Sequence, residues 1–325
     1  MAKALGLLSG GLDSSLAALT LKKQGLEVTC VAFVTPFFGA DKARDAAARM
    51  DIPLLVRDIS EVHLEMVKNP HYGYGKNMNP CIDCHAMMFR FAGEIMEEIG
   101  ADFLFSGEVL GQRPMSQNSN ALKAVAKHSG LKGQILRPLS ARLLPETSME
   151  DTGLVDRDAL LDIQGRSRKR QEALARQWGL DDYPASGGGC LLTEKSFSGR
   201  LRDLLEKNPD ATAADVELLK HGRQFRLANG TRLILGRNEA DNGRLEALAG
   251  VDDLKLRSAA FRGPLGLVRG RIDDRDLREA AALVASYGKG REEQRLEVLV
   301  KGAGTQIVMK VTPMGRQEAR ELAVL

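Results

Sequence analysis

A short loop rich in glycine and serine joins the first apolar segment of the chain to an amphipathic one. It reads Ser9-Gly10-Gly11-Leu12-Asp13-Ser14-Ser15. Backbone N–H groups at the start of a helix attract anions, glycines let the chain approach one closely, and serine hydroxyls add donors. A carboxylate beside polyphosphate makes chemical sense if it holds Mg²⁺, which assigns that role to Asp13. The structural alternative is a tight turn before a helix capped by Asp13 or Ser14.

Three of the four cysteines have residue types and spacing that suit metal or sulfur chemistry. Cys81 and Cys84 have C-x-x-C spacing and can reach one metal, and Cys190 would add a third thiolate from across a cleft. Three thiolates on a [4Fe–4S] cluster leave one iron without a protein ligand, and that iron is a site for hydrosulfide. Cys30 lies inside an apolar segment and is predicted to be a core residue.

Two other uses of these cysteines stay open at the level of the sequence. Cys84 and Cys190 can form the nucleophile and resolving pair of a persulfide relay. A structural zinc ion is the other use of a C-x-x-C pair, and His71 and His85 are the nearby residues for its missing fourth ligand. A disulfide framework is not expected, because no secretory segment is evident.

The elements that must position these residues alternate between apolar strands and amphipathic helices. This alternation predicts an α/β fold with a doubly wound parallel sheet. The predicted strands are Lys3–Leu8, Val28–Val34, Ile52–Val56, Phe103–Ser106 and Gln134–Leu136, and the helices are Ser14–Lys23, Lys42–Met50 and Ala86–Ile99. Two long irregular segments, Asn69–Pro80 and Gly107–Asn120, interrupt the pattern, and we expect them to surround the site.

The pattern changes after a segment rich in proline, glycine and serine, Asp181–Gly189. We therefore expect two domains, residues 1–190 and residues 191–325. The second is predicted to be a smaller α+β domain with two hairpins. Its predicted helices are 196–206 and 213–220, and its hairpins pair Gln224–Leu227 with Arg232–Leu235, and Leu296–Val300 with Gln306–Val311 around Gly302-Ala303-Gly304.

Composition places the chain among ordinary globular proteins, with 43% hydrophobic and 27% charged residues and a net charge of +3. No apolar stretch approaches the roughly 18 residues that span a bilayer, and the start of the chain lacks the apolar core of a signal peptide. We expect a cytoplasmic protein with no membrane partner. Residues 191–325 hold 24 basic and 20 acidic residues, and 17 of the basic ones are arginine. Arginine matches phosphate geometry, so this half is the expected nucleic-acid contact, with solvated charged faces as the alternative.

The loop Ser9–Ser15 resembles the PP-loop signature of the ATP pyrophosphatase superfamily, whose members cleave ATP to AMP and pyrophosphate while adenylating a substrate. No P-loop NTPase motif occurs in the chain. The resemblance implies an adenine nucleotide alpha hydrolase-like fold in which the loop holds pyrophosphate. It places the backbone of Ala32 and Phe33 near the adenine and Ser106-Gly107 on the opposite wall. The phosphate-loop residues themselves are Ser9, Gly10, Gly11, Asp13, Ser14 and Ser15.

The cysteine segments narrow the resemblance to tRNA thiolases. Asn79–His85 resembles the first-cysteine segment of bacterial tRNA 2-thiouridylases, and Gly187–Leu191 resembles their second. Gly107–Gln112 with Ser116-Gln117, continued by Leu136–Leu139, is similar to tRNA 4-thiouridine synthetases. Cys81 stands where the 2-thiouridylase segment usually carries another residue, and this difference favours the thiolases that depend on a cluster. We therefore predict that Cys81, Cys84 and Cys190 hold a [4Fe–4S] cluster, with zinc or no metal as alternatives.

Two further segments point to RNA. Gly165–Gln171 carries four basic residues in five at the start of a predicted helix, and either RNA phosphates or solvent would face them. Leu235–Asn242 resembles the Gly-Arg-Asn segment of the NFACT-type RNA-binding domain, which implies that residues 191–325 hold or orient RNA. A lid or an oligomerisation domain is the alternative. His63, His128 and His221 are isolated in the sequence, and we assign them no role.

These observations predict an ATP-dependent tRNA sulfurtransferase with Asp13, Cys84 and Cys190 as catalytic residues. ATP would adenylate a uridine carbonyl oxygen, and sulfur from sulfide or a persulfide carrier would displace AMP. The predicted cofactors are ATP, Mg²⁺ and the cluster, and the predicted partner is tRNA. One alternative moves sulfur to a small molecule or cofactor. The other is a non-catalytic RNA-binding protein that binds nucleotide only as a ligand.

Overall fold

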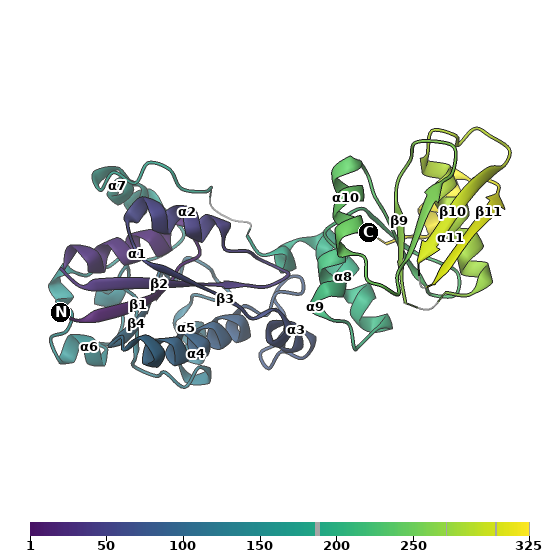
Figure 1. The fold of residues 1–325 in the computed structure, drawn as a ribbon. Coiled ribbons are helices and arrows are strands. Elements are labelled where there is room, and N and C mark those ends of the chain that lie inside the picture. The colour runs from purple at the N-terminus through teal and green to yellow at the C-terminus, as the bar shows by residue number, and fades with distance from the viewer. Residues whose placement is uncertain (186–188, 271, 303, 325) are drawn as a thin grey trace. The chain divides into compact units, whose positions relative to one another are not determined.

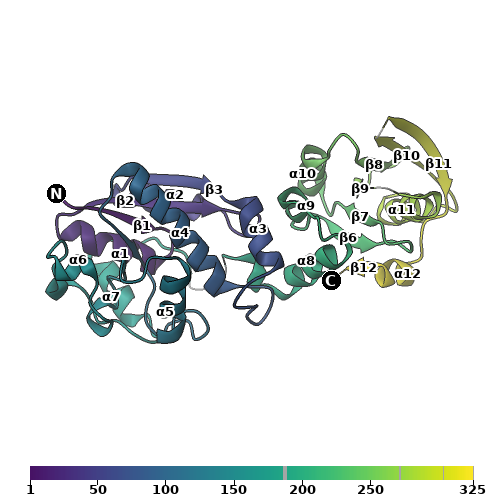
Figure 2. The ribbon, with the colours of Figure 1, turned by 90° about the horizontal axis from the view of Figure 1, so that it is seen from below.

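A computed structural model describes residues 1–185, 189–270, 272–302 and 304–324 (Figures 1 and 2). The chain divides into two compact units, Met1–Thr193 and Glu194–Leu325. We call them the N-terminal unit and the C-terminal unit and describe each by itself. Gly187 and Gly188 of the second-cysteine segment and Ala303 of the second predicted hairpin lie outside the described residues.

A five-stranded parallel sheet forms the centre of the N-terminal unit, in the order β3-β2-β1-β4-β5. The strands are β1 (Lys3–Leu7), β2 (Glu27–Val34), β3 (Leu54–Asp58), β4 (Phe103–Ser106) and β5 (Ile135–Leu136). The predicted doubly wound parallel sheet is confirmed. Strand order reverses between β1 and β4, and the crevice beyond the carboxyl ends of such a strand pair is where open α/β sheets bind ligands.

Helices cover both faces of this sheet because its strands alternate two sets of apolar side chains (Figure 1). Ala4, Cys30 and Ala32 face one core, which packs under α1 (Leu12–Lys23), α2 (Asp41–Met50) and α7 (Lys169–Gln177). Leu5, Val31 and Phe33 face the other core, which packs under α4 (Cys81–Ile99) and α5 (Ser119–His128). In Figure 2, α4 crosses the strands. Shorter elements complete the unit: α3 (Ser60–Lys68), η1 (Ala141–Leu143), α6 (Ser148–Asp151), η2 (Arg157–Ala159) and η3 (Leu191–Thr193).

Two helices in this unit differ from the prediction near the site. The helix α4 begins at Cys81, five residues before the predicted start at Ala86, because Pro80 can occupy its N-cap without losing a helical hydrogen bond. The helix α5 begins at Ser119, inside the end of the predicted loop, where the Asn118 side chain accepts a hydrogen bond from the Ala121 N–H. Both cysteines of the C-x-x-C pair are therefore helical.

The C-terminal unit contains a seven-stranded antiparallel sheet in the order β11-β10-β8-β9-β7-β6-β12. This confirms a second α+β domain and both predicted hairpins. The strands are β6 (Arg223–Arg226), β7 (Arg232–Leu235), β8 (Leu254–Ser258), β9 (Gly266–Arg269), β10 (Leu296–Gly302), β11 (Thr305–Val311) and β12 (Ala323–Val324), and the helices are α8 (Lys195–Lys207), α9 (Ala213–Leu218), α10 (Glu239–Leu248), α11 (Asp274–Tyr287) and α12 (Arg316–Glu321).

Apolar cores lie on both faces of the second sheet. One includes Leu283 and Val284 of α11, and the other joins Leu218 to Leu245 of α10. The unit thus has a hydrophobic core separate from that of the N-terminal unit. No helix among the described parts of the chain has the length and apolar character needed to cross a membrane.

Candidate nucleotide and cysteine site

The predicted phosphate loop lies at the carboxyl end of β1, directly before α1. Gly10 has a φ of +75°, and a Cβ there would lie 2.2 Å from the carbonyl carbon of Lys42, so only glycine lets the loop pack on the start of α2. The Ser14 hydroxyl donates to the Gly11 carbonyl at 2.9 Å, and Ser15 follows on the same turn. The loop geometry suits an anion at the start of α1.

The loop after β4 forms the opposite wall. A Cβ on Gly107 would lie 2.4 Å from the Ser14 nitrogen, so this glycine permits close contact with α1. Gln112 donates to Asp13 Oδ2 at 2.8 Å, while Asp13 Oδ1 and Gln112 Oε1 are buried without a hydrogen-bond partner among the described residues. Buried oxygens rarely stay unpaired, and two of them beside a phosphate loop suit a hard cation such as Mg²⁺.

The basic segment at the start of α7 lies beside the same loops. The Gly165 N–H donates to the Leu110 carbonyl at 2.8 Å, and Lys23 at the end of α1 lies 5.2 Å from the Trp178 ring at the end of α7. The ends of α1 and α7 therefore lie close together, and the segment before α7 contacts the loop after β4. The Nε of Arg168 is buried and unpartnered within the described structure. Residue spacing predicted RNA or solvent opposite this segment, and it missed the contact with the loop after β4.

The first turn of α4 presents Cys81 and Cys84. The Asn79 amide donates to Cys81 Sγ at 3.3 Å, and His63 Nε2 lies 3.2 Å from Cys84 Sγ. His63 is fully buried, and burial lowers its pKa to about 4, so it is neutral at physiological pH. The sequence interpretation of His63 as isolated was wrong, because the chain between α3, which carries His63, and Cys84 folds back and brings the two side chains together.

The segment after Cys190 returns to the same place. The Leu191 N–H donates to the Phe37 carbonyl at 3.0 Å, and the Phe37 ring lies 5.4 Å from the His63 ring. Burial, and after it the charges of Cys190, Cys81 and Asp83, raises the pKa of the Cys84 thiol well above its usual range. The structure therefore brings Cys190 close to the C-x-x-C pair, from which it is more than a hundred residues away in sequence.

Cys30 is separate from this group. It is 1% exposed, lies in the core under α1 and α2, and has a pKa that burial raises to about 12. This is the environment of an inert core thiol, as predicted. Among the residues that the structure describes, no three His, Cys, Asp or Glu side chains form a ready-made metal site. Cluster binding by Cys81, Cys84 and Cys190 stays a prediction.

A buried carboxylate connects the cysteines to the phosphate loop. Glu108 follows Gly107, accepts a hydrogen bond from Arg137 Nε at 2.9 Å, and lies 2.7 Å from His85 Nδ1. Burial works to raise the pKa of Glu108, but Arg137 and His85 outweigh it and lower that pKa to about 2. Sequence spacing missed this connection, because 23 residues separate Glu108 from His85.

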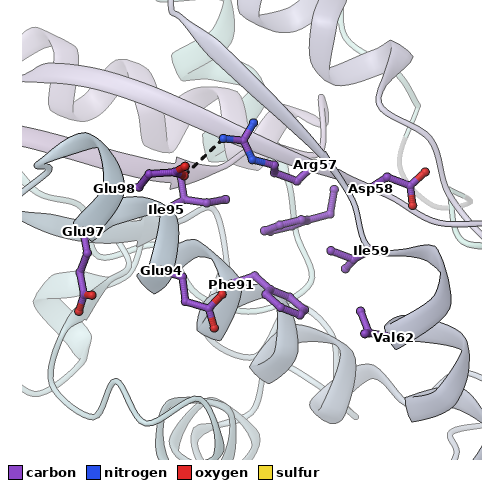
Figure 3. Close-up of a pocket in the computed structure, with 10 residues that line it drawn as sticks. Arg57, Asp58, Ile59, Val62, Phe91, Glu94, Ile95, Glu97 and Glu98 are labelled. Atoms are coloured by element: carbon purple, nitrogen blue, oxygen red, sulfur yellow. Dashed lines mark hydrogen bonds and ion pairs between the residues drawn. The ribbon is translucent and has the colours of Figure 1, made fainter.

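Phe33 has its backbone and its side chain in different environments. Its backbone is near the carboxyl end of β2, where adenine contact by Ala32 and Phe33 stays a prediction. Its side chain lines a hollow of about 620 Å³ between β3, α3 and α4 (Figure 3). Four carboxylates line that hollow, and Arg57 lies 3.4 Å from one of them, Glu98. Because it contains neither a cysteine nor a phosphate-loop residue, we do not assign it to the site.

The Gly-Arg-Asn segment of the C-terminal unit shapes the turn from β7 into α10. The Asn238 side chain caps α10 by accepting from the Asp241 N–H at 2.9 Å. Arg237 Nε lies 2.6 Å from Asp241, and a Cβ on Gly236 would lie 2.0 Å from Asn242 Oδ1. The turn from β7 into α10 requires these residue types at these positions, which explains why the Gly-Arg-Asn pattern can be recognised in the sequence.

Comparison with known proteins identifies the class of each unit. Residues 1–142 match the family described as thiamine biosynthesis protein (ThiI), and residues 222–322 match the NFACT protein RNA binding domain. The predicted resemblance to PP-loop tRNA thiolases, with an NFACT-type domain after them, is thereby confirmed.

The curated relatives are similar to part of this chain. The tRNA-specific 2-thiouridylase MnmA of Dichelobacter nodosus is 28% identical over 61% of this chain and 54% of its own. A probable tRNA sulfurtransferase of Staphylococcus epidermidis is 28% identical over 42% of this chain and 34% of its own. The MnmA of Rhodopseudomonas palustris is 31% identical over 37% of this chain and 34% of its own. The chain thus spans from about a third to about half the length of these relatives.

Proposed function

We propose that this chain is an ATP-dependent tRNA sulfurtransferase. ATP transfers its adenylyl group to a uridine carbonyl oxygen and releases pyrophosphate, and a sulfur nucleophile then displaces AMP. The matches to families and relatives concerned with tRNA thiolation support this reaction class. Because tRNA is the substrate, the protein acts in the cytoplasm.

The observation that carries the proposal is the connection through Glu108. This carboxylate contacts His85, next to Cys84, and directly follows Gly107, which packs on Ser14. Adenylation and sulfur transfer act on the same carbon of the base, so the groups that serve them must share one edge of the sheet. The Glu108 carboxylate, fixed between the loop after β4 and the helix α4, keeps the phosphate-binding and cysteine groups at a constant distance from each other.

Phosphate binding is assigned to the loop Ser9–Ser15, with Asp13 holding Mg²⁺. Fixed donors and a cation around the α-phosphate stabilise the charge that develops there. Arg168 is proposed as an added cation for the departing pyrophosphate, because it belongs to the basic segment whose Gly165 contacts the loop after β4, and its buried Nε has no partner among the described residues. Asp13 and Gln112 are positioned against each other by their hydrogen bond.

Cys81, Cys84 and Cys190 are the proposed ligands of a [4Fe–4S] cluster. The donor set fits, because the three thiols lie close together: burial first, and after it repulsion from Cys190 and Cys81, raises the pKa of Cys84. A bound cationic centre relieves that repulsion. A cluster with three thiolate ligands supplies one iron free for a sulfur donor. Asn79 donates to Cys81 Sγ and would orient that ligand.

The C-terminal unit is the proposed tRNA-holding domain, on the strength of its match to an RNA-binding family. The test is pyrophosphate release by the full chain with bulk tRNA added or withheld. Stimulation by tRNA supports the proposal. Release that does not require RNA favours a small-molecule acceptor, and no release favours a nucleotide-dependent RNA-binding protein.

A further inference from the structure

Three exposed or partly exposed rings gather beside the first turn of α4. His71 and Tyr72 come from the loop before this helix, and His128 ends α5. The imidazole rings of His71 and His128 are stacked, with centroids 5.3 Å apart and planes at 9°. Tyr72 meets both edge-on, at 4.8 Å and 84° from His71 and at 5.6 Å and 89° from His128. We call these three residues the aromatic platform.

The platform is fixed without being buried. The backbone N–H groups of His71 and Tyr72 donate to the Asp83 carboxylate at 3.1 and 3.0 Å, and Asp83 is only 3% exposed. Tyr72 is nevertheless 42% exposed, and the His128 side chain is 44% exposed. Rings that are held in place and open to solvent offer flat faces on which another ring can stack.

The anchor also fixes where the platform lies. Asp83 stands between Cys81 and Cys84 in the same turn of α4. The backbone that carries two of the three rings is therefore anchored to the same helical turn as the cysteines. Lys127, next to His128, is exposed and adds a positive charge.

We propose that the aromatic platform binds an unpaired nucleotide of the RNA substrate by stacking. Unpaired bases are splayed from RNA and stacked on aromatic side chains in many sequence-tolerant sites, because every base has a flat face. The adjacent Lys127 suits a backbone phosphate. This stacking role extends the proposed function, and it rests on that function only for the identification of the bound RNA as the tRNA substrate. The bound nucleotide is the one that reacts or its direct neighbour.

The test is photocrosslinking of the full chain, without ATP or sulfide, to a short single-stranded oligouridylate that carries 5-iodouridine. After irradiation, digestion and mass spectrometry locate the adduct. We expect adducts on Tyr72, His71 or His128. The Tyr72→Phe variant keeps the ring and retains crosslinking, whereas Tyr72→Leu loses it. In tRNA-dependent pyrophosphate release, Tyr72→Leu raises the KM for tRNA about tenfold, the scale of one lost stacking contact.

Adducts confined to the C-terminal unit, or equal crosslinking of the Leu and Phe variants, would overturn the platform. Melting temperature and ATP affinity show whether Tyr72→Leu is folded, and if it is not, His128→Leu replaces it with the same expected loss. Failure of the platform is distinguishable from failure of the proposed function. If tRNA stimulates pyrophosphate release but no platform residue is crosslinked, the proposed function stands and the stacking role is wrong. If platform residues are crosslinked but tRNA does not stimulate release, the stacking role stands and the proposed function is wrong.

Discussion

Asp13 is held by one carboxylate oxygen and leaves the other buried without a partner in the described structure. We predict that Asp13→Asn binds ATP but loses pyrophosphate release by about a hundredfold or more, because the amide keeps the size and removes the charge that holds Mg²⁺. ATP binding by calorimetry and pyrophosphate release in a coupled assay give the two readouts. Asp45→Asn, on the exposed side of α2, is the control. Unchanged turnover in Asp13→Asn would remove Asp13 from the reaction.

The cysteines separate three models of sulfur transfer. If Cys81, Cys84 and Cys190 share a cluster, serine at any one of them removes iron and thiolation together from anaerobically prepared protein. A persulfide relay keeps activity in Cys81→Ser and loses it in the other two variants. A structural zinc ion gives colourless protein that contains zinc and unfolds when a ligand is replaced. Iron and zinc analysis with an absorption spectrum distinguishes them.

Cys30→Ser is the matched control for this series. It places a hydroxyl in the core and should cost about 1–3 kcal/mol of stability without changing iron content. If Cys30→Ser also lost iron, reduced stability alone would explain the loss of iron in the other cysteine variants.

At the scale of elements, Glu108 joins the loop after β4 to α4 through His85 and to the end of β5 through Arg137. Its folded-state pKa, about 2, lies below the ordinary value of 4.5, so the folded protein binds fewer protons than the unfolded chain between these values. The ionised Glu108 carboxylate therefore contributes its full stabilisation above pH 4.5, and this contribution is lost as the pH falls toward 2.

We predict that Glu108→Gln lowers the free energy of unfolding at neutral pH by on the order of 3 kcal/mol and flattens its decline below pH 4.5. Denaturant unfolding across this pH range measures both effects. Glu98→Gln, a more exposed carboxylate on α4, should behave like the natural protein. Equal pH slopes in Glu108→Gln and the natural protein would contradict the buried network.

The sequence allowed prediction of those parts of the site that lie within one short segment. The phosphate loop and the C-x-x-C pair could be recognised because the chemistry is local. The helix α3, which carries His63 to Cys84, was missed, because its apolar residues Val62, Leu64 and Met66 alternate along the chain and do not follow helical spacing. The contacts of Glu108 with His85, and of Gly165 with Leu110, depend on how separate elements pack. Residue spacing along the chain does not encode that packing.

Helices of the C-terminal unit were missed for a related reason. The helix α11 has a nearly continuous apolar run, Ala280–Ala285, whose period does not separate helix from strand. The strand β9 is short and buried on both faces, which removes the alternation that marks a half-exposed strand. The strand β8 does alternate buried Leu254 and Leu256 with more exposed Lys255 and Arg257, and this short signal was missed.

At the scale of the whole molecule, the C-terminal unit has its own core and a net charge of +4, from 24 basic and 20 acidic residues. We predict that residues 194–325 expressed alone fold and bind tRNA, with affinity that falls as salt concentration rises, because phosphate contacts release counterions. Filter binding across a salt series measures this. Binding that ignores salt, or its absence, would favour a lid or an oligomerisation domain.

The most direct test of the account is nucleoside analysis of tRNA after reaction. The anaerobically prepared full chain is incubated with ATP, Mg²⁺, sulfide and unmodified bulk tRNA, and the digested tRNA is examined by mass spectrometry. The account predicts a thiolated uridine, formed with one AMP and one pyrophosphate per sulfur and absent when ATP or tRNA is withheld. ATP cleavage that produces no thiolated nucleoside, with the cluster intact, would contradict it.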